Sequence, residues 1–130
     1  MVVAIQCIRD YYNQPIQIIS SYRHYECNLS AGGATFSQHK NAGALDFKFV
    51  GSNARSKYRA YSDDVINQTG VFPDLIAIGV GGFGSYANSF HIDTRTGGHQ
   101  RYNGIDYALW GKFMADGYSI DFEHPYGIDE

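Results

Sequence analysis

Long apolar runs and dense charge are both absent from this sequence. No stretch approaches the roughly 20 apolar residues that a membrane-spanning helix needs, so we expect no membrane span. The first seven residues have no basic flank and too short an apolar stretch for a signal peptide. Charged residues make up 18% of the chain and the formal net charge is −3. Because that balance gives no general attraction to phosphate backbones, we also expect no nucleic-acid partner.

Cysteine is scarce, and repeats, low-complexity tracts and linkers are missing. Cys7 and Cys27 could pair or remain two partly buried thiols, and their spacing does not decide between these alternatives. An uninterrupted chain of 130 residues predicts a single domain over residues 1–130, large enough to bury a core. Eleven Tyr and fifteen Gly are the abundant residues, and they suit a domain that shapes a groove from loops.

The spacing of apolar residues predicts a small α+β domain. Helical periodicity and period-two alternation locate the elements. The predicted helices are residues 2–12, 54–68 and 105–114, with a short helix at 24–30 inside a polar loop; the predicted strands are 16–19, 43–50, 75–78 and 89–95. The tail from residue 121 is polar and we expect it to pack loosely. We therefore expect a small antiparallel sheet with helices packed on one face.

Two of the predicted strands alternate clearly, so each has a buried face and a polar face. Asp46 lies on the polar face of strand 43–50, and His91, Asp93 and Arg95 share the polar face of strand 89–95. The apolar positions that point the other way are Leu45, Phe47, Phe49, Phe90 and Ile92. Ionisable side chains are thus expected to meet on the face that the helices leave open.

A candidate metal site is formed by two of these residues, Asp46 and His91, together with His39. His39 lies seven residues before Asp46, in the loop that leads into its strand, and His91 lies on the other strand. Two imidazoles and one carboxylate with an open fourth position are typical of a catalytic zinc site, whereas a closed structural site takes four ligands, usually with thiolates. The alternative is that these are surface and loop histidines, since five histidines in the chain give many chance pairs.

Three blocks of sequence carry a resemblance to a known family. They are Ser20-Ser21-Tyr22-Arg23 with Asn28, then Ser37-Gln38-His39 through Ala44-Leu45-Asp46, then Ser89-Phe90-His91-Ile92-Asp93. In this order they resemble the zinc D-Ala-D-Ala carboxypeptidase family, which has the hedgehog/DD-peptidase fold. Its members include cell-wall carboxypeptidases, endopeptidases and phage endolysins. The resemblance runs from about residue 14 to residue 95.

The resemblance implies roles for individual residues. His39, Asp46 and His91 would be the zinc ligands. Arg23 would contact the substrate, in accord with a guanidinium that fits a carboxylate or a peptide carbonyl. Ser37, on the same substrate side, would order the loop around His39. The alternatives are a surface arginine for Arg23 and a plain turn serine for Ser37.

The resemblance also implies a substrate and a location. The substrate would be a peptidoglycan stem peptide or cross-link, cut by a monomeric enzyme at the bacterial cell wall. Either another protein would then release it across the membrane, as for phage lysis enzymes, or the sequence would be a domain cut from a longer chain.

Two positions depart from the family pattern. Ala42 stands where the family usually has Gly, and Gly43 follows it. Several branches place an acidic general base three residues before the last histidine, where this chain has Asn88. Other branches carry His-x-Asp, which makes Asp93 the candidate base; its alternative role is a partner that orients a ligand. Asn88 also leaves open a catalytically weak or inactive zinc-bearing module that binds cell wall or a protein partner.

The run Gly79-Val80-Gly81-Gly82-Phe83-Gly84 spells a dinucleotide-binding fingerprint. That fingerprint requires a helix to begin at the third glycine, and here the chain leads into another strand. We therefore reject nucleotide binding and expect these glycines to let the backbone pass close to substrate.

Overall fold

The computed structural model describes residues 2–22, 43–86, 89–115 and 118–122. These residues form helices and strands in mixed order along the chain. The elements are α1 (Val2–Tyr12), β1 (Ile16–Tyr22), β2 (Ala44–Phe49), α4 (Ala54–Asn67), α5 (Phe72–Ala77), β3 (Gly82–Ser85), β4 (Phe90–Asp93), β5 (Gln100–Tyr102), β6 (Ile105–Ala115) and β7 (Tyr118–Phe122).

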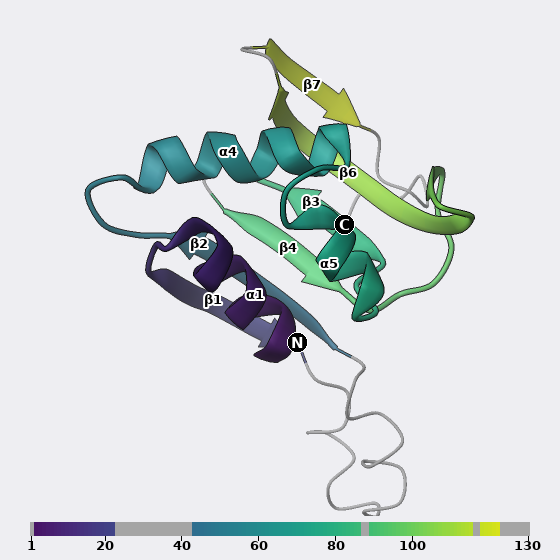
Figure 1. Cartoon of the computed structure of the whole chain (residues 1–130), viewed down its shortest axis with the longest axis horizontal. Coiled ribbons are helices and arrows are strands. Elements are labelled where there is room, and N and C mark those ends of the chain that lie inside the picture. The colour runs from purple at the N-terminus through teal and green to yellow at the C-terminus, as the bar shows by residue number, and fades with distance from the viewer. Residues whose placement is uncertain (1, 23–42, 87–88, 116–117, 123–130) are drawn as a thin grey trace, which may run out of the picture.

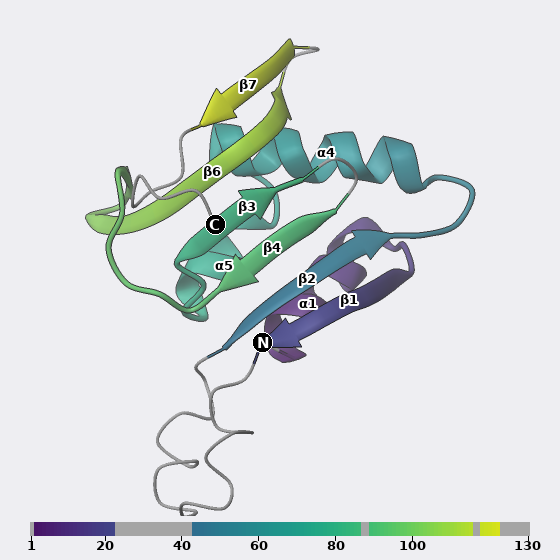
Figure 2. The same ribbon diagram turned by 180° about the vertical axis from the view of Figure 1, so that it is seen from behind.

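The strands form one sheet in the order β1-β2-β4-β3-β6-β5, with β7 also paired to β6. Neighbouring strands are antiparallel except β3 and β6, which are parallel. α1, α4 and α5 all lie on one side of the sheet, in front of the strands in Figure 1 and behind them in Figure 2. The predicted α+β fold, with helices on one face of a mainly antiparallel sheet, is confirmed.

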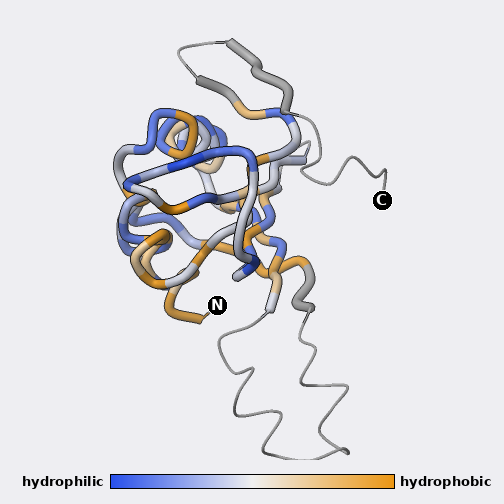
Figure 3. The backbone as a smooth tube through the Cα atoms, turned by 90° about the vertical axis from the view of Figure 1, so that its right-hand side faces the viewer, coloured by the Kyte–Doolittle hydropathy of each residue, from blue (hydrophilic) through white to orange (hydrophobic). Residues whose placement is uncertain are grey.

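The first helix shows how the sequence pattern becomes packing. α1 buries Ala4, Ile8 and Tyr12, which are four residues apart and are exposed by 2%, 0% and 5%. Residues with this spacing share one side of a helix, and that side faces the sheet. The chain starts with hydrophobic residues (Figure 3), of which Val2 and Val3 are exposed by 72% and 61%.

Aromatic rings join the helical layer to the centre of the sheet. Phe47 on β2, Phe90 on β4 and Tyr61 on α4 are buried. The ring centroids of Phe47 and Phe90 are 5.8 Å apart, and Tyr61 lies 5.7 Å from Phe47 and 4.5 Å from Phe90. Burying each such side chain stabilises the fold by about 1.5–3 kcal/mol. The predicted inward-facing positions of both strands therefore form the core.

The prediction of a strand at residues 75–78 is wrong, because these residues belong mainly to helix α5. Phe72, Leu75 and Ile76 are buried, with the i, i+3, i+4 spacing of a helix. Pro73 lies at the start of the helix, where a missing N–H is tolerated, and Asp74 in the first turn suits the helix dipole. The apolar run at residues 75–78 was too short to show helical spacing, because the first turn of α5 precedes it.

The prediction of a helix at residues 105–114 is also wrong, because strand β6 spans this segment. Tyr102 pairs with Ile105 across a two-residue turn in which Asn103 and Gly104 have φ of 49° and 79°. Asn-Gly with positive φ at both positions is the preferred turn of a tight β-hairpin. β6 then lies between β3 and β5. Its residues Tyr107 to Trp110 are all buried, so this run lacks the alternation of a surface strand.

Three smaller predictions, on the C-terminal tail, a short loop helix and the two cysteines, fall wholly or partly outside the described residues. β7 reaches Phe122 and so extends two residues into the tail predicted from residue 121, and residues 123–130 lie outside the described residues. The short helix predicted at 24–30 also falls outside them. Cys7 is a free, partly buried thiol packed against the core, and Cys27 lies beyond the described part of the chain.

Candidate active site

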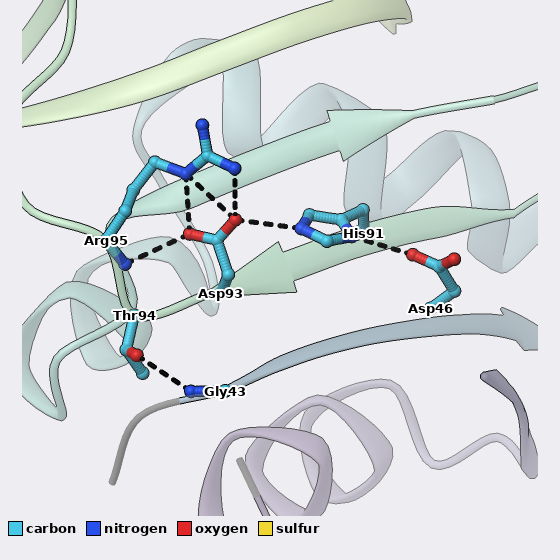
Figure 4. A network of polar contacts seen from close by, with 6 residues as sticks. All are labelled: Gly43, Asp46, His91, Asp93, Thr94 and Arg95. Carbon is cyan, nitrogen blue, oxygen red and sulfur yellow. Dashed lines mark hydrogen bonds and ion pairs between the residues drawn. The ribbon is translucent and has the colours of Figure 1, made fainter. Parts of the chain in front are cut away.

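The pairing of β2 with β4 places the predicted polar residues side by side on the open face of the sheet. Asp46 and His91 are directly opposite each other in the antiparallel register. His91 Nδ1 lies 2.7 Å from Asp46 Oδ1, and His91 Nε2 lies 2.8 Å from Asp93 Oδ2. Figure 4 shows both contacts, with the imidazole between the two carboxylates. The His91 and Asp93 side chains are only 10% and 7% exposed, and that of Asp46 is 17% exposed.

Asp93 is held by Arg95 as well as by His91. Arg95 Nε lies 2.9 Å from both carboxylate oxygens, Arg95 Nη2 lies 2.6 Å from Oδ2, and the Arg95 backbone N–H donates to Oδ1 over 3.1 Å. Burial raises the pKa of the Asp93 carboxyl, but hydrogen bonds from His91 and Arg95 and the charge of Arg95 outweigh it, so the net pKa is lowered. Asp93 is therefore an ionised carboxylate at neutral pH.

Thr94, directly after β4, is hydrogen-bonded to Gly43, directly before β2. The Gly43 backbone N–H donates to Thr94 Oγ1 over 3.2 Å, and the Thr94 backbone N–H donates to the Gly43 carbonyl over 3.3 Å. Gly43 is four residues after His39. The strand carrying His91 and Asp93 is thus tied to the segment that leads from His39 to Asp46.

Strand β3 makes room for this network because it carries glycine where its side chains would point to the open face. A Cβ on Gly82 would lie 2.1 Å from Asp93 Oδ1 and 2.8 Å from Arg95 Nε. A Cβ on Gly84 would lie 2.6–2.8 Å from atoms of the Trp110 indole. The glycine run therefore accommodates side chains of neighbouring strands, and its rejection as a nucleotide-binding loop agrees with the strand that begins at Gly82.

Trp110 completes the floor of the site from β6. Its ring centroid lies 5.3 Å from that of His91, and the Arg95 guanidinium carbon lies 4.5 Å from the indole centroid. Trp110 is 6% exposed. One side of the polar network is therefore covered by the Trp110 ring and shielded from solvent.

Of the predicted site residues, Asp46, His91 and Asp93 come together, and Arg23, Ser37 and His39 lie outside the described residues. Sequence reasoning assigned no role to Arg95 or Trp110. The alternation of residues 89–95 did place Arg95 on the face of His91. Trp110 was missed because its segment was predicted as a helix, and the Asn-Gly turn was the signal that could have corrected this.

The donor atoms of Asp46 and His91 fit part of a metal site. Two ligands of a tetrahedral zinc ion, each ~2.0–2.1 Å from the metal, lie about 3.3 Å apart, and here Asp46 Oδ1 and His91 Nδ1 are separated by 2.7 Å. A small widening of this contact would admit the ion. Among the residues that the structure describes, no group of three His, Cys, Asp or Glu side chains is arranged to hold a metal.

A family model described as Peptidase M15 matches residues 1–93 of the 130. The chain belongs to the peptidase M15 family. This confirms the resemblance to zinc D-Ala-D-Ala carboxypeptidases and indicates a peptidase. No curated protein and no solved structure matches the chain. The match includes Asp46 and His91 and ends at Asp93, so Arg95 and Trp110 lie beyond it.

Proposed function

We propose that this M15 peptidase is zinc-dependent and hydrolyses peptide bonds in the stem peptides or cross-links of peptidoglycan, at the bacterial cell wall. The observation that carries the proposal is the contact between Asp46 and His91 across β2 and β4, within the part of the chain that the family model matches. An imidazole and a carboxylate that face each other on an open sheet face supply two donors of a catalytic zinc site. We expect the enzyme to act as a monomer.

Asp46, His91 and His39 would hold the zinc ion. When bound, zinc supplies Lewis-acid polarisation of the scissile carbonyl and of the attacking water. His91 would use Nδ1, the nitrogen that faces Asp46, because its Nε2 faces Asp93. His39 would complete the set from the segment that leads into β2, and Arg23 and Ser37 would act on the substrate side.

Asp93 has two candidate roles, and its contacts support the orienting one. An imidazole that donates its second N–H to a carboxylate is fixed in tautomer and orientation for metal binding. Both oxygens of Asp93 are already within hydrogen-bond distance of Arg95 or His91, and its pKa is lowered. A carboxylate in that state is a poor proton acceptor. Asp93 as general base remains the alternative.

The proposal is tested by incubating purified peptidoglycan and defined muropeptides with the zinc-loaded protein. We expect soluble peptide fragments whose masses identify the bond cut, loss of release on chelation, and recovery on adding zinc. His91→Ala should be inactive. The matched control is His99→Ala, which changes an exposed histidine outside this network.

Zinc binding without hydrolysis of any muropeptide would contradict the peptidase assignment. That result would favour the alternative of a zinc-bearing module that only binds cell wall or a protein partner, which the Asn88 departure leaves open. A protein that retains no zinc would contradict the metal assignment itself.

A further inference from the structure

Arg95 has a more specific geometry than a surface ion pair. Its Nε and Nη2 atoms both lie within 2.9 Å of the Asp93 carboxylate, and its own backbone N–H also donates to that group. The pair is largely enclosed, with side-chain exposures of 24% for Arg95 and 7% for Asp93. A planar guanidinium that binds a carboxylate through two nitrogens fixes both its position and its rotation.

The guanidinium itself is held from the other side. Its central carbon lies 4.5 Å from the indole centroid of Trp110, a distance at which the aromatic face attracts a cation. Space for this stack exists only because β3 carries Gly82 next to Arg95 Nε and Gly84 next to the Trp110 ring. Asp93 on β4 and Trp110 on β6 thus contact Arg95, and the glycines of β3 leave the space that this placement needs.

The chain of contacts ends at the candidate metal ligand. Arg95 fixes Asp93, and Asp93 Oδ2 lies 2.8 Å from His91 Nε2, as Figure 4 shows. The opposite nitrogen of His91 faces Asp46. Rotation of the Asp93 carboxylate would therefore release the imidazole that presents Nδ1 to Asp46.

We propose that Arg95 is a positioning residue of this site: seated on Trp110, it holds the Asp93 carboxylate against His91 Nε2 and so sets the orientation of the His91 ring. The consequence for zinc and turnover rests on the proposed function, whereas the effect on the His91 ring does not. Both Arg95 and Trp110 lie beyond the residues that the family model matches, so the inference comes from the geometry of this chain.

The first experiment compares two arginine-to-lysine changes. Arg95→Lys keeps the charge and removes the fork, and Arg101→Lys does the same to an arginine that is 68% exposed and pairs with Asp106 through Nε. Zinc affinity is measured by competition with a chelator, followed by the emission of Trp110, the only tryptophan in the chain. We expect about a 10- to 100-fold loss of affinity for Arg95→Lys, the usual scale for removing an outer partner of a metal ligand, and less than a twofold change for Arg101→Lys.

A second measurement needs no metal and no activity. The ring ¹⁵N shifts of His91 in metal-free protein should change in Arg95→Lys and stay as in wild type in Arg101→Lys. A merely structural arginine would instead lower the melting temperature and leave both the His91 shifts and the zinc affinity of the folded protein unchanged. That pattern would overturn the proposal.

Trp110→Leu provides an independent variant should Arg95→Lys not fold. It keeps an apolar side chain and removes the aromatic face, so we expect about a two- to fivefold loss of zinc affinity and a change in the His91 shifts, with zinc release followed by a coloured chelator. Unchanged His91 shifts in this variant would overturn the proposal. If wild type shows no zinc binding but its His91 shifts respond to Arg95→Lys, the proposed function fails and the positioning role stands.

Discussion

The two faces of β2 and β4 carry different kinds of side chain, apolar on the face covered by helices and ionisable on the open face. On the helix-covered face, Phe47 and Phe90 pack against Tyr61 and are almost completely buried. On the open face, Asp46 and His91, one residue along from them, form polar contacts. Because neighbouring residues of a strand point to opposite faces, a single register fixes the core and the site together.

The two faces also differ in how many contacts share the work of holding each side chain in place. The covered face is a large aromatic cluster, in which many contacts each contribute a little. The open face has few residues, and each has a specific partner. Substitutions on the covered face should therefore change stability more than chemistry, and those on the open face should do the reverse.

The largest expected effect on stability is that of Phe90→Ala. Phe90 is fully buried and stacks on Tyr58 with ring centroids 4.4 Å apart. We expect a loss of about 3–5 kcal/mol in the free energy of unfolding, measured by urea denaturation. Since small domains have only about 5–15 kcal/mol in total, the variant should lose a large part of its stability. A loss below about 1 kcal/mol would contradict the assignment of this face as the core.

His91→Ala should have the opposite profile. It removes a proposed ligand, so we expect tight zinc binding to be lost while the melting temperature falls far less than in Phe90→Ala. Metal analysis after gel filtration measures the first quantity and calorimetry the second. A full equivalent of zinc in the variant would show that His91 is not a ligand, and the exposed His99→Ala serves as the control for generic effects of the substitution.

Asp93→Asn separates the two roles of Asp93 on the open face. If Asp93 orients His91, the amide should weaken zinc affinity by about 10- to 100-fold. If Asp93 is instead the general base, zinc should remain bound while kcat falls by about 10²- to 10⁴-fold. We expect the first result, because the contacts of Asp93 are those of an orienting partner. Asp106→Asn, an exposed aspartate outside the site, is the matched control.

The smallest expected effect concerns the hydroxyl of Tyr61, which belongs to the aromatic cluster of the covered face. Among the described residues it has no hydrogen-bond partner although it is buried. An unsatisfied buried hydroxyl is unfavourable, so Tyr61→Phe should stabilise the protein by about 1 kcal/mol at pH 7. Tyr12→Phe is the contrasting control, because its hydroxyl donates to Asp64.

The same tyrosine gives a prediction for alkaline pH. Burial raises the pKa of Tyr61 far above its ordinary value of about 10. The neutral form is thus favoured in the folded state, and the stability linked to it is complete below pH 10 and is lost as the pH rises further. The advantage of Tyr61→Phe should therefore grow above pH 10 in urea denaturation. An advantage that stays constant with pH would contradict the burial of this hydroxyl.

Sequence patterns were sufficient where one strand face is buried and the other is polar. Strands β2 and β4 alternate, so the sequence alone places Asp46, His91 and Asp93 on one face. Their mutual register could not be read from alternation, since that pattern does not say which residues pair. The direct opposition of Asp46 and His91 comes from the fold.

The missed parts of the site have physical causes in the fold. Residues Tyr107 to Trp110 of β6 are all buried, so this run carries no periodicity that distinguishes a strand from a helix. Trp110 was misplaced for that reason, and with it the surface that supports Arg95. Contacts such as those of Gly82 and Gly84 depend on neighbouring strands that are distant in sequence, and local patterns do not contain that information.

The most direct test of the central claim is to locate zinc in a crystal of the metal-loaded protein by anomalous scattering at the zinc absorption edge. We predict one ion per chain, bound by an Asp46 carboxylate oxygen and His91 Nδ1 at about 2.0–2.2 Å, with His91 Nε2 still donating to Asp93. His39 should supply a further ligand. An anomalous peak elsewhere, coordination through His91 Nε2, or the absence of a peak at this position in zinc-saturated crystals would contradict the account.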